Sequence, residues 1–250
     1  MPIFNDDDAT NFKASGSGYQ FSGTKLSQLQ ALGASKYTLV AIGCDRSTSV
    51  ESFGGDIEKC LKTTLEGCQK SPQVDNLLVR LLAFNHSLEE VHGYRPLADC
   101  HLAAYDGFLQ PGGQTALYDA TVNLADSLAT YGQQLVDQDY EVNGLLVVIT
   151  DGVNVGGKNA VRQSREAIER AKKQEALESL VSILIGINVT DPTVSQYLAS
   201  FKDEAGFREY VEAKDATAKT FAKIANFISR SVSSQSQSVG SKQASQPVTF

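Results

Sequence analysis

The chain of 250 residues lacks the segments that would assign it to a membrane or to a secretion route. Residues 1–8 contain neither the basic start nor the apolar run of a signal peptide. No segment approaches the roughly 18 consecutive apolar residues that a membrane-spanning helix needs. We therefore expect a cytoplasmic protein that does not contact a membrane.

Cysteine is scarce, and no two of the four cysteines form a CxxC pair. Zinc sites built from cysteine usually contain such ligand pairs, so their absence argues against a site of this kind. Cys60 and Cys68 fall on the apolar stripe of a predicted helix over residues 56–70, where cysteine serves as a small core residue. A cytoplasmic location would also keep the thiols reduced.

Basic residues are outnumbered by acidic ones, with 22 Lys and Arg against 29 Asp and Glu, which gives a formal net charge of -7. An acidic surface repels the phosphates of nucleic acids and of anionic membranes. We therefore expect neither of these as a partner. The same acidity is compatible with a site that holds a cation.

Three apolar runs of strand length are present, over residues 37–44, 144–150 and 180–187. Near-continuous apolar runs are typical of parallel strands that are covered on both faces. Further strands are predicted over residues 77–85 and 207–211. Amphipathic helices are predicted between the strands, over residues 56–70, 117–131, 159–178, 194–201 and 216–232. This alternation predicts a doubly wound, mostly parallel α/β sheet of the Rossmann-like kind, with helices on both faces.

Residues 88–97 follow the strand over residues 77–85 too closely for a crossover helix, and so they predict one antiparallel edge strand. We place the α/β domain at residues 35–232. Residues 1–34 are interpreted as an extension that packs on this domain. Residues 233–250 are rich in Ser and Gln, and they predict a disordered tail because they bury too little apolar surface to become ordered.

Oxygen-bearing side chains gather on three loops that follow strands or precede a helix. Asp45, Ser47 and Ser49 form an Asp-x-Ser-x-Ser motif after the first apolar strand. Thr115 follows a glycine-containing loop, and Asp151 follows the second apolar strand within Thr-Asp-Gly. The carboxyl ends of parallel strands meet at one crevice, so the three loops are expected to converge. Carboxylates and hydroxyls are hard oxygen ligands, which favours Mg²⁺, with Mn²⁺ or Ca²⁺ as substitutes.

Each motif taken alone has a simpler explanation. Asp45 and Ser47 are also suited to capping the helix that follows them, and Asp151 is also suited to a turn before Gly152. Arg46 within the first motif either points to solvent, where it would steer an acidic partner, or offsets nearby acids. The three motifs together, at the expected ends of the strands, favour a metal site over these explanations.

In these motifs the chain resembles the von Willebrand factor A (VWA) domain family, over about residues 35–232. The family carries a metal-ion-dependent adhesion site (MIDAS) made of Asp-x-Ser-x-Ser, a Thr after a glycine-rich loop, and an Asp that is usually in Thr-Asp-Gly. All of these positions are matched here in the same order. One departure is Thr48, where many members have Gly; this removes no ligand.

The resemblance implies a role for each matched residue. The hydroxyls of Ser47, Ser49 and Thr115 would contact the metal directly. Asp45 and Asp151 would act largely through bound water. The last coordination position would then accept an Asp or Glu side chain from a partner protein.

The function implied by this resemblance is a metal-dependent protein–protein interaction module. Short intracellular members of the family serve as scaffolds or regulators, often beside ATPases, kinases or phosphatases. The alternative is a metal-dependent hydrolase or phosphatase on the same sheet. The chain contains no GxSxG elbow and no GxxxxGK[ST] loop, and only Arg46 is available as a phosphate clamp. We therefore expect that it is not an enzyme.

Overall fold

The computed structural model describes residues 9–70, 74–173 and 176–238. Its eight strands form one sheet in the order β1-β2-β5-β4-β3-β6-β7-β8. The strands are β1 (Ala9–Lys13), β2 (Gln20–Thr24), β3 (Lys36–Asp45), β4 (Leu77–Phe84), β5 (Leu88–Pro96), β6 (Glu141–Thr150), β7 (Ser179–Ile187) and β8 (Glu209–Ala213). Strands β4, β3, β6, β7 and β8 run parallel to one another, and β5 is antiparallel to β4. The predicted doubly wound, mostly parallel sheet is confirmed.

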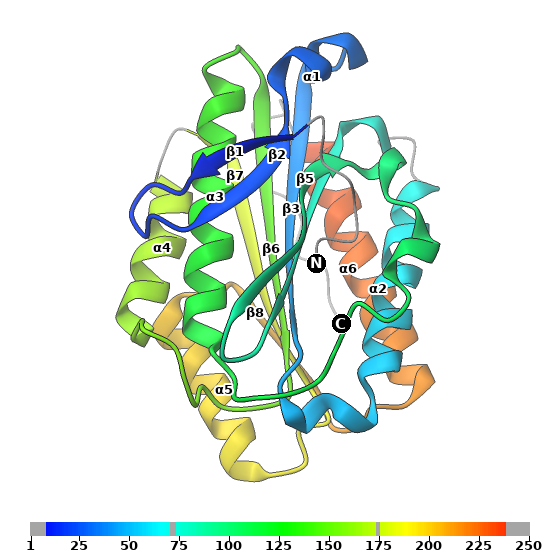
Figure 1. Cartoon of the computed structure of the whole chain (residues 1–250), viewed down its shortest axis with the longest axis vertical. Helices are drawn as coiled ribbons and strands as arrows, with labels where there is room; N and C mark the ends of the chain where they lie inside the picture. Colours follow the sequence, from blue (N-terminus) through cyan, green and yellow to red (C-terminus); the bar gives the residue numbers. More distant parts are fainter. Residues whose placement is uncertain (1–8, 71–73, 174–175, 239–250) are drawn as a thin grey trace.

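Helices cover both faces of the sheet (Figure 1). They are α1 (Leu26–Leu32), α2 (Gly54–Gln69), α3 (Leu117–Val136), α4 (Val161–Lys173), α5 (Pro192–Ala205) and α6 (Ala218–Ser238). Helices α3, α4 and α5 lie on one face, and α2 and α6 lie side by side on the other. Each face has its own apolar cluster against the sheet. The central strands are therefore buried on both sides, as their apolar sequences predict.

The sheet extends beyond the antiparallel strand that we expected at its edge. β2 pairs in parallel with β5 through Gly23 and Tyr94, and β1 pairs antiparallel with β2. Gly93 allows this close approach, because a Cβ atom at that position would lie 2.1 Å from the backbone oxygen of Ser22. The N-terminal segment therefore contributes two strands to the sheet that sequence patterning did not reveal.

Helix α6 continues to Ser238, beyond the boundary expected at Val232, because Gln235 is fully buried and hydrogen-bonded. Gln235 Nε2 donates to the backbone oxygen of Gly144 at 2.8 Å. Asn143 Nδ2 donates to the backbone oxygen of Gln235 at 2.8 Å, and Ser179 Oγ donates to Gln235 Oε1 at 3.1 Å. We call Asn143, Ser179 and Gln235 the amide cluster. The rest of the predicted tail, residues 239–250, lies outside the described residues.

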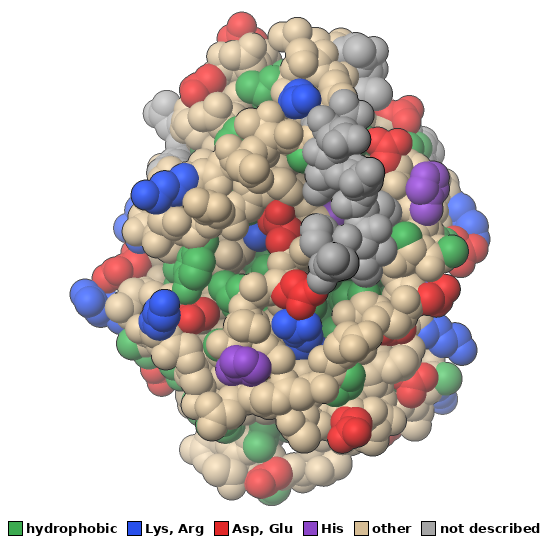
Figure 2. Space-filling model, in the orientation of Figure 1, with side chains coloured by type: hydrophobic (Ala, Val, Ile, Leu, Met, Phe, Trp, Pro, Cys, Tyr) green, Lys and Arg blue, Asp and Glu red, His purple; other side chains and the backbone are tan. Residues whose placement is uncertain are grey.

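Three further features concern the length of the helices, the charges on the surface and the state of the cysteines. Among the described residues, no helix is long and apolar enough to cross a membrane. Acidic and basic side chains are interspersed over the described part of the face in Figure 2. All four cysteines are buried as free thiols, and Cys60 and Cys68 lie on the buried side of α2 as predicted.

Candidate metal centre

The candidate site is built where β3 and β6 end side by side. These strands are parallel neighbours with Cys44 opposite Ile149, so Asp45 and Thr150 lie at the same edge of the sheet. This is the edge from which the chain enters the loops before α2 and α4, at the lower end of the sheet in Figure 1. Asp45 has no exposed surface. The first sequence motif thus begins inside the protein and continues outward along its loop.

Two hydrogen bonds fix the carboxylate of Asp45. The backbone N–H of Ser47 donates to its Oδ1 at 2.8 Å. The hydroxyl of Thr150 donates to its Oδ2 at 2.6 Å. Asp45 is therefore held between the loop after β3 and the last residue of β6, which ties this loop to the end of β6.

The remaining hydroxyls link this first loop to Asp151. The hydroxyl oxygens of Ser47 and Ser49 are 3.0 Å apart. Ser49 Oγ donates to Asp151 Oδ1 at 2.8 Å. Ser47 is buried, whereas Ser49 is exposed, so the cluster reaches the protein surface. Four of the five residues identified from the sequence are thus brought into one hydrogen-bonded group.

Thr115 lies on the third loop, which backbone contacts hold against the other two. Thr48 N donates to the oxygen of Gly113 at 3.1 Å, and Val155 N donates to the oxygen of Thr115 at 2.9 Å. Gly113 has φ of +78°, and a Cβ atom there would lie 2.2 Å from His86 Nδ1, so only glycine fits. Thr115 is 5% exposed, and its hydroxyl makes no hydrogen bond to any residue that the structure describes.

The two acids of the site lack a basic partner among the described residues. Burial raises the pKa of Asp45 to about 6, against the opposing hydrogen bonds from Thr150 and Ser47. Burial likewise raises the pKa of Asp151, although the hydrogen bond from Ser49 lowers it. A buried carboxylate without a counter-charge is stabilised when a cation binds beside it.

Arg46 does not supply that counter-charge. It lies on the loop after β3, but its Nη1 pairs with Glu89 Oε2 at 2.5 Å, and its side chain is only 12% exposed. Of the two interpretations of Arg46, exposure to solvent is therefore wrong, and neutralisation of a nearby acid is confirmed. The carboxylate that it neutralises is on β5, outside the candidate site.

The side chains of the site fit a hard divalent cation. Hydroxyl groups can turn their lone pairs toward an ion, and the hydroxyl of Thr115 has no other described partner. Two carboxylates match the charge of such an ion. Within the described ranges, no group of three or more His, Cys, Asp or Glu side chains is placed to hold a metal. The candidate centre differs from such groups because three of its five side chains are hydroxyls and only two are carboxylates.

Sequence reasoning missed two residues that support the site. Thr150 holds Asp45, as described above. Asn85, directly after β4, donates from Nδ2 to the oxygen of Gly112 at 2.6 Å, and its own backbone oxygen accepts from Ala116 N at 2.7 Å. It therefore fixes both sides of the loop that carries Thr115. The available signal was a polar residue directly after an apolar strand, the same signal that identified Asp45.

No protein-family model matches this chain, and no curated protein matches it. Solved structures do share its fold. The PilB minor pilin from Streptococcus sanguinis superposes with a TM-score of 0.56 at 15% identity, over 82% of this chain and 62% of that one. The pilus adhesin SpaC from Lactobacillus rhamnosus GG, in its open conformation, gives 0.57 at 12% identity, over 79% and 30%.

A third similar structure is that of proximal thread matrix protein 1 from the mussel byssus with a zinc-occupied MIDAS motif. Its TM-score is 0.52 at 18% identity, over 79% of this chain and 46% of that one. The fold is VWA-like. The present chain spans less than two thirds of the length of each of these three proteins. At these identities the likeness establishes the fold alone, and the cytoplasmic location stays a prediction.

Proposed function

We propose that this chain is a metal-dependent protein-interaction module with a complete MIDAS. The metal ligands in this proposal are Asp45, Ser47, Ser49, Thr115 and Asp151. The observation that carries the proposal is the hydrogen-bonded group of hydroxyls and carboxylates at the ends of β3 and β6, in which neither acid has a basic partner among the described residues. Mg²⁺ is the proposed ion, and Mn²⁺ or Ca²⁺ would substitute for it.

The chemistry of the ligands explains how a partner would bind. Ser47, Ser49 and Thr115 would contact the ion directly, and a neutral hydroxyl leaves most of the ion's positive charge in place. Asp45 and Asp151 would act largely through water and hold the shell. An octahedral ion with three direct protein ligands keeps coordination positions for water or for an external oxygen. The carboxylate of a partner's Asp or Glu is the ligand proposed for one of these positions.

We propose binding without catalysis. A phosphatase or phosphotransferase needs a cationic clamp beside the metal to stabilise the transferred group. Arg46 is the basic residue within the first motif, and it already pairs with Glu89. A role as an intracellular scaffold or regulator, including one beside an ATPase, a kinase or a phosphatase, is the form of this function that the family resemblance favours.

Affinity capture from a lysate of the native cells tests the proposal. Three samples are compared. The wild type is the bait in buffer with Mg²⁺ and in buffer with EDTA, and Thr115→Ala is the bait in buffer with Mg²⁺. A true partner is retained by the wild type in Mg²⁺ and lost in the other two samples. Thr48→Ala is the matched control, because its exposed hydroxyl contacts the Gly113 oxygen at 3.3 Å and is not a proposed ligand.

Two results would contradict the proposal. The first is a set of captured proteins that is the same in all samples. The second is Mg²⁺-dependent hydrolysis of a phosphate ester by the wild type that Thr115→Ala abolishes, because this would assign the site to the enzymatic alternative. The Thr48→Ala control should behave as the wild type in both measurements.

A further inference from the structure

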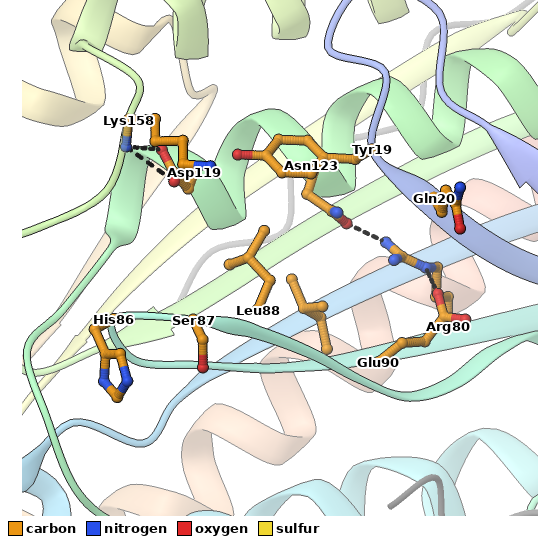
Figure 3. Close-up of a pocket in the computed structure, with 11 residues that line it drawn as sticks. Tyr19, Gln20, Arg80, His86, Ser87, Leu88, Glu90, Asp119, Asn123 and Lys158 are labelled. Atoms are coloured by element: carbon orange, nitrogen blue, oxygen red, sulfur yellow. Dashed lines mark hydrogen bonds and ion pairs between the residues drawn. The ribbon is translucent and has the colours of Figure 1, made fainter.

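A second polar site lies away from the candidate metal centre. A cleft of about 450 Å³ opens between β2, the turn from β4 to β5, and α3 (Figure 3). We call it the β2–α3 cleft. Its lining includes Arg80, Leu88, Asp119, Asn123 and Lys158, and none of the five proposed metal ligands. Its volume is within the range of small-molecule sites in proteins.

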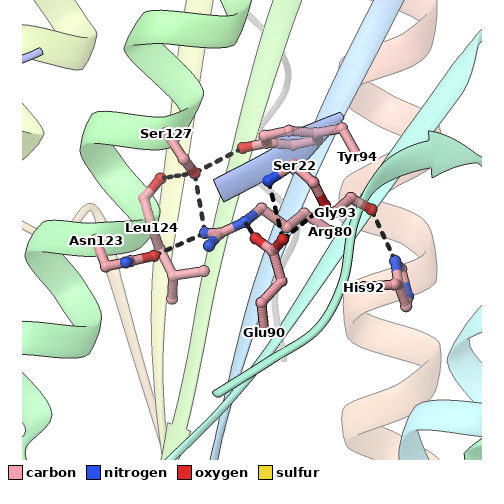
Figure 4. Close-up of polar contacts among 9 residues, drawn as sticks. All are labelled: Ser22, Arg80, Glu90, His92, Gly93, Tyr94, Asn123, Leu124 and Ser127. Carbon is pink, nitrogen blue, oxygen red and sulfur yellow. Dashed lines mark hydrogen bonds and ion pairs between the residues drawn. The ribbon is translucent and has the colours of Figure 1, made fainter. Parts of the chain in front are cut away.

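Arg80 is the unusual member of this lining, because it is a charged residue with no exposed surface in an otherwise apolar strand. Its Nε donates to Glu90 Oε2 at 2.7 Å. Its Nη1 donates to Asn123 Oδ1 at 2.8 Å and to Ser127 Oγ at 3.2 Å (Figure 4). The ring of Phe21 lies 5.4 Å from the guanidinium carbon and helps to hold the group in one orientation.

The second terminal nitrogen of this guanidinium, Nη2, is buried and has no hydrogen-bond partner among the described residues. A buried N–H without an acceptor is costly, so such groups are rare in folded proteins. Because the rest of the Arg80 side chain is held by three partners, it cannot turn Nη2 outward without breaking those bonds. The structure therefore contains a fixed donor that lacks an acceptor.

The acidic groups of the cleft are already occupied by protein donors. Glu90 Oε1 accepts from both the backbone N–H and the hydroxyl of Ser22, at 2.9 and 2.7 Å. Asp119 Oδ1 accepts from the backbone N–H groups of Lys158 and Asn159, at 3.0 and 2.8 Å. A ligand with donor groups would have to compete with these bonds. The two carboxylates of the cleft therefore have protein donors, whereas Arg80 Nη2 has no acceptor among the described residues.

Lys158 offers a second unused donor. Its side chain is exposed, and its ammonium forms no ion pair with a described residue. Figure 3 shows Lys158 and Arg80 on opposite sides of the cleft, with Leu88 between them. A complementary ligand thus has an acceptor at each end and an apolar middle.

We propose that the β2–α3 cleft binds a small organic dicarboxylate. One carboxylate accepts from Arg80 Nη2 after a small shift of the lining side chains, because Nη2 itself has almost no exposed surface. The other carboxylate pairs with the Lys158 ammonium, and the methylene groups pack on Leu88. Two acidic and two basic side chains line the cleft, so its net charge attracts an anion only weakly. We therefore expect a dissociation constant in the millimolar range.

Isothermal titration with succinate and acetate at constant ionic strength tests this. Metal ions are first removed on a chelating resin, because carboxylates also bind metals. We expect saturable binding of succinate and weaker binding of acetate. Lys158→Ala should weaken succinate binding about tenfold, or about 1.4 kcal/mol, and leave acetate binding unchanged. Lys219→Ala, which removes the same charge from an exposed position on α6, should change neither.

Arg80→Lys tests the other end of the cleft. It keeps the positive charge beside Glu90 but removes Nη2, so it should abolish binding of both acids while thermal unfolding shows a folded protein. The proposal is overturned by wild type that does not bind succinate saturably, or by equal losses in Lys158→Ala and Lys219→Ala. A folded Arg80→Lys protein that binds succinate normally would also overturn it. If Arg80→Lys does not fold, the comparison of Lys158→Ala with Lys219→Ala decides the outcome.

Discussion

The two ends of β6 carry polar clusters of opposite character. At its start, the amide cluster buries neutral groups that pair with one another and with the backbone, as in the bond from Gln235 to the Gly144 oxygen. At its end, Thr150 leads into the candidate metal centre. There Asp45 and Asp151 have raised pKa values, and the hydroxyl of Thr115 has no partner among the described residues.

This difference separates polar residues that stabilise the fold from polar residues that are placed to bind a ligand. A buried polar cluster whose groups are all paired adds rigidity and specificity to the fold. A cluster with uncompensated negative charge is stabilised further only when a cation binds. Substitutions at the start of β6 should therefore lower stability, whereas substitutions at its end should mainly remove binding.

The largest expected effect is at the middle of β6, between the two clusters. Leu146 has no exposed surface, and Leu146→Ala should lower the free energy of unfolding by about 2–5 kcal/mol through the lost transfer energy and the cavity. Urea denaturation measures this. The folded variant should retain the wild-type dissociation constant for Mg²⁺. A loss of metal binding without a loss of stability would break the proposed separation.

The next effect is the stabilisation by metal. Mg²⁺ at 100 times its dissociation constant should raise the free energy of unfolding of the wild type by about 2.7 kcal/mol. Thr115→Ala should show no such gain, yet its metal-free stability should stay near that of the wild type, because the hydroxyl has no described partner to lose. Thermal unfolding with and without Mg²⁺ measures both. If Thr115→Ala fails to fold, Thr115 belongs to the scaffold and its assignment is wrong.

A smaller effect is expected from the amide cluster. Gln235→Leu removes the side-chain donor to the Gly144 oxygen and one of the two acceptors near Ser179 Oγ, and a buried polar group left unpaired should cost about 1–3 kcal/mol of stability. Gln237→Leu is the matched control, because it changes an exposed glutamine on the same helix. Denaturant unfolding of both variants checks this. Equal stabilities would show that the cluster is not structural.

The smallest effect concerns pH at a buried group outside both clusters. Burial lowers the pKa of His92 from 6.5 to about 3, with Arg95 and Arg80 acting in the same direction. Its Nδ1 hydrogen-bonds to the Gly93 oxygen at 2.8 Å, and Tyr105 lies 2.9 Å from Nε2. The unfolded chain then binds more protons below pH 6.5, so stability falls as the pH drops from about 6.5 toward about 3.

The loss of folding stability caused by His92 amounts to about 1 kcal/mol between pH 7 and pH 5.5. His92→Gln keeps polar partners for the neighbouring groups but does not titrate. Its stability should therefore depend less steeply on pH over this window than that of the wild type. Parallel slopes for the two proteins, from denaturant unfolding at several pH values, would show that His92 is not the cause.

The central strands and the candidate ligands were predictable from the sequence because their signals are local. An apolar run identifies β3, β6 or β7, and parallel topology then places the residues after these strands at one edge. Strands β1 and β2 were not predictable. They are short and partly polar, and their pairing depends on the absence of a side chain at Gly93, a contact made with a distant part of the chain.

The supporting residues of the sites were missed for a similar reason. Asn85 and Thr150 act on loops that are far away in sequence, and only the folded structure shows which loops they contact. Arg80 lies within a strand that is otherwise apolar, and its position in the sequence gives no sign of a separate role. Its burial depends on partners from β5 and α3 that local patterning does not reveal.

The most direct test of the central claim is an isothermal titration of the purified chain with Mg²⁺ and with Mn²⁺. The proteins compared are the wild type, Ser49→Ala, Thr115→Ala and the Thr48→Ala control. We predict that the wild type and Thr48→Ala bind a single ion per chain and that Ser49→Ala and Thr115→Ala bind none while remaining folded. A wild type that binds neither ion, or equal binding by all four proteins, would contradict the assignment of this site.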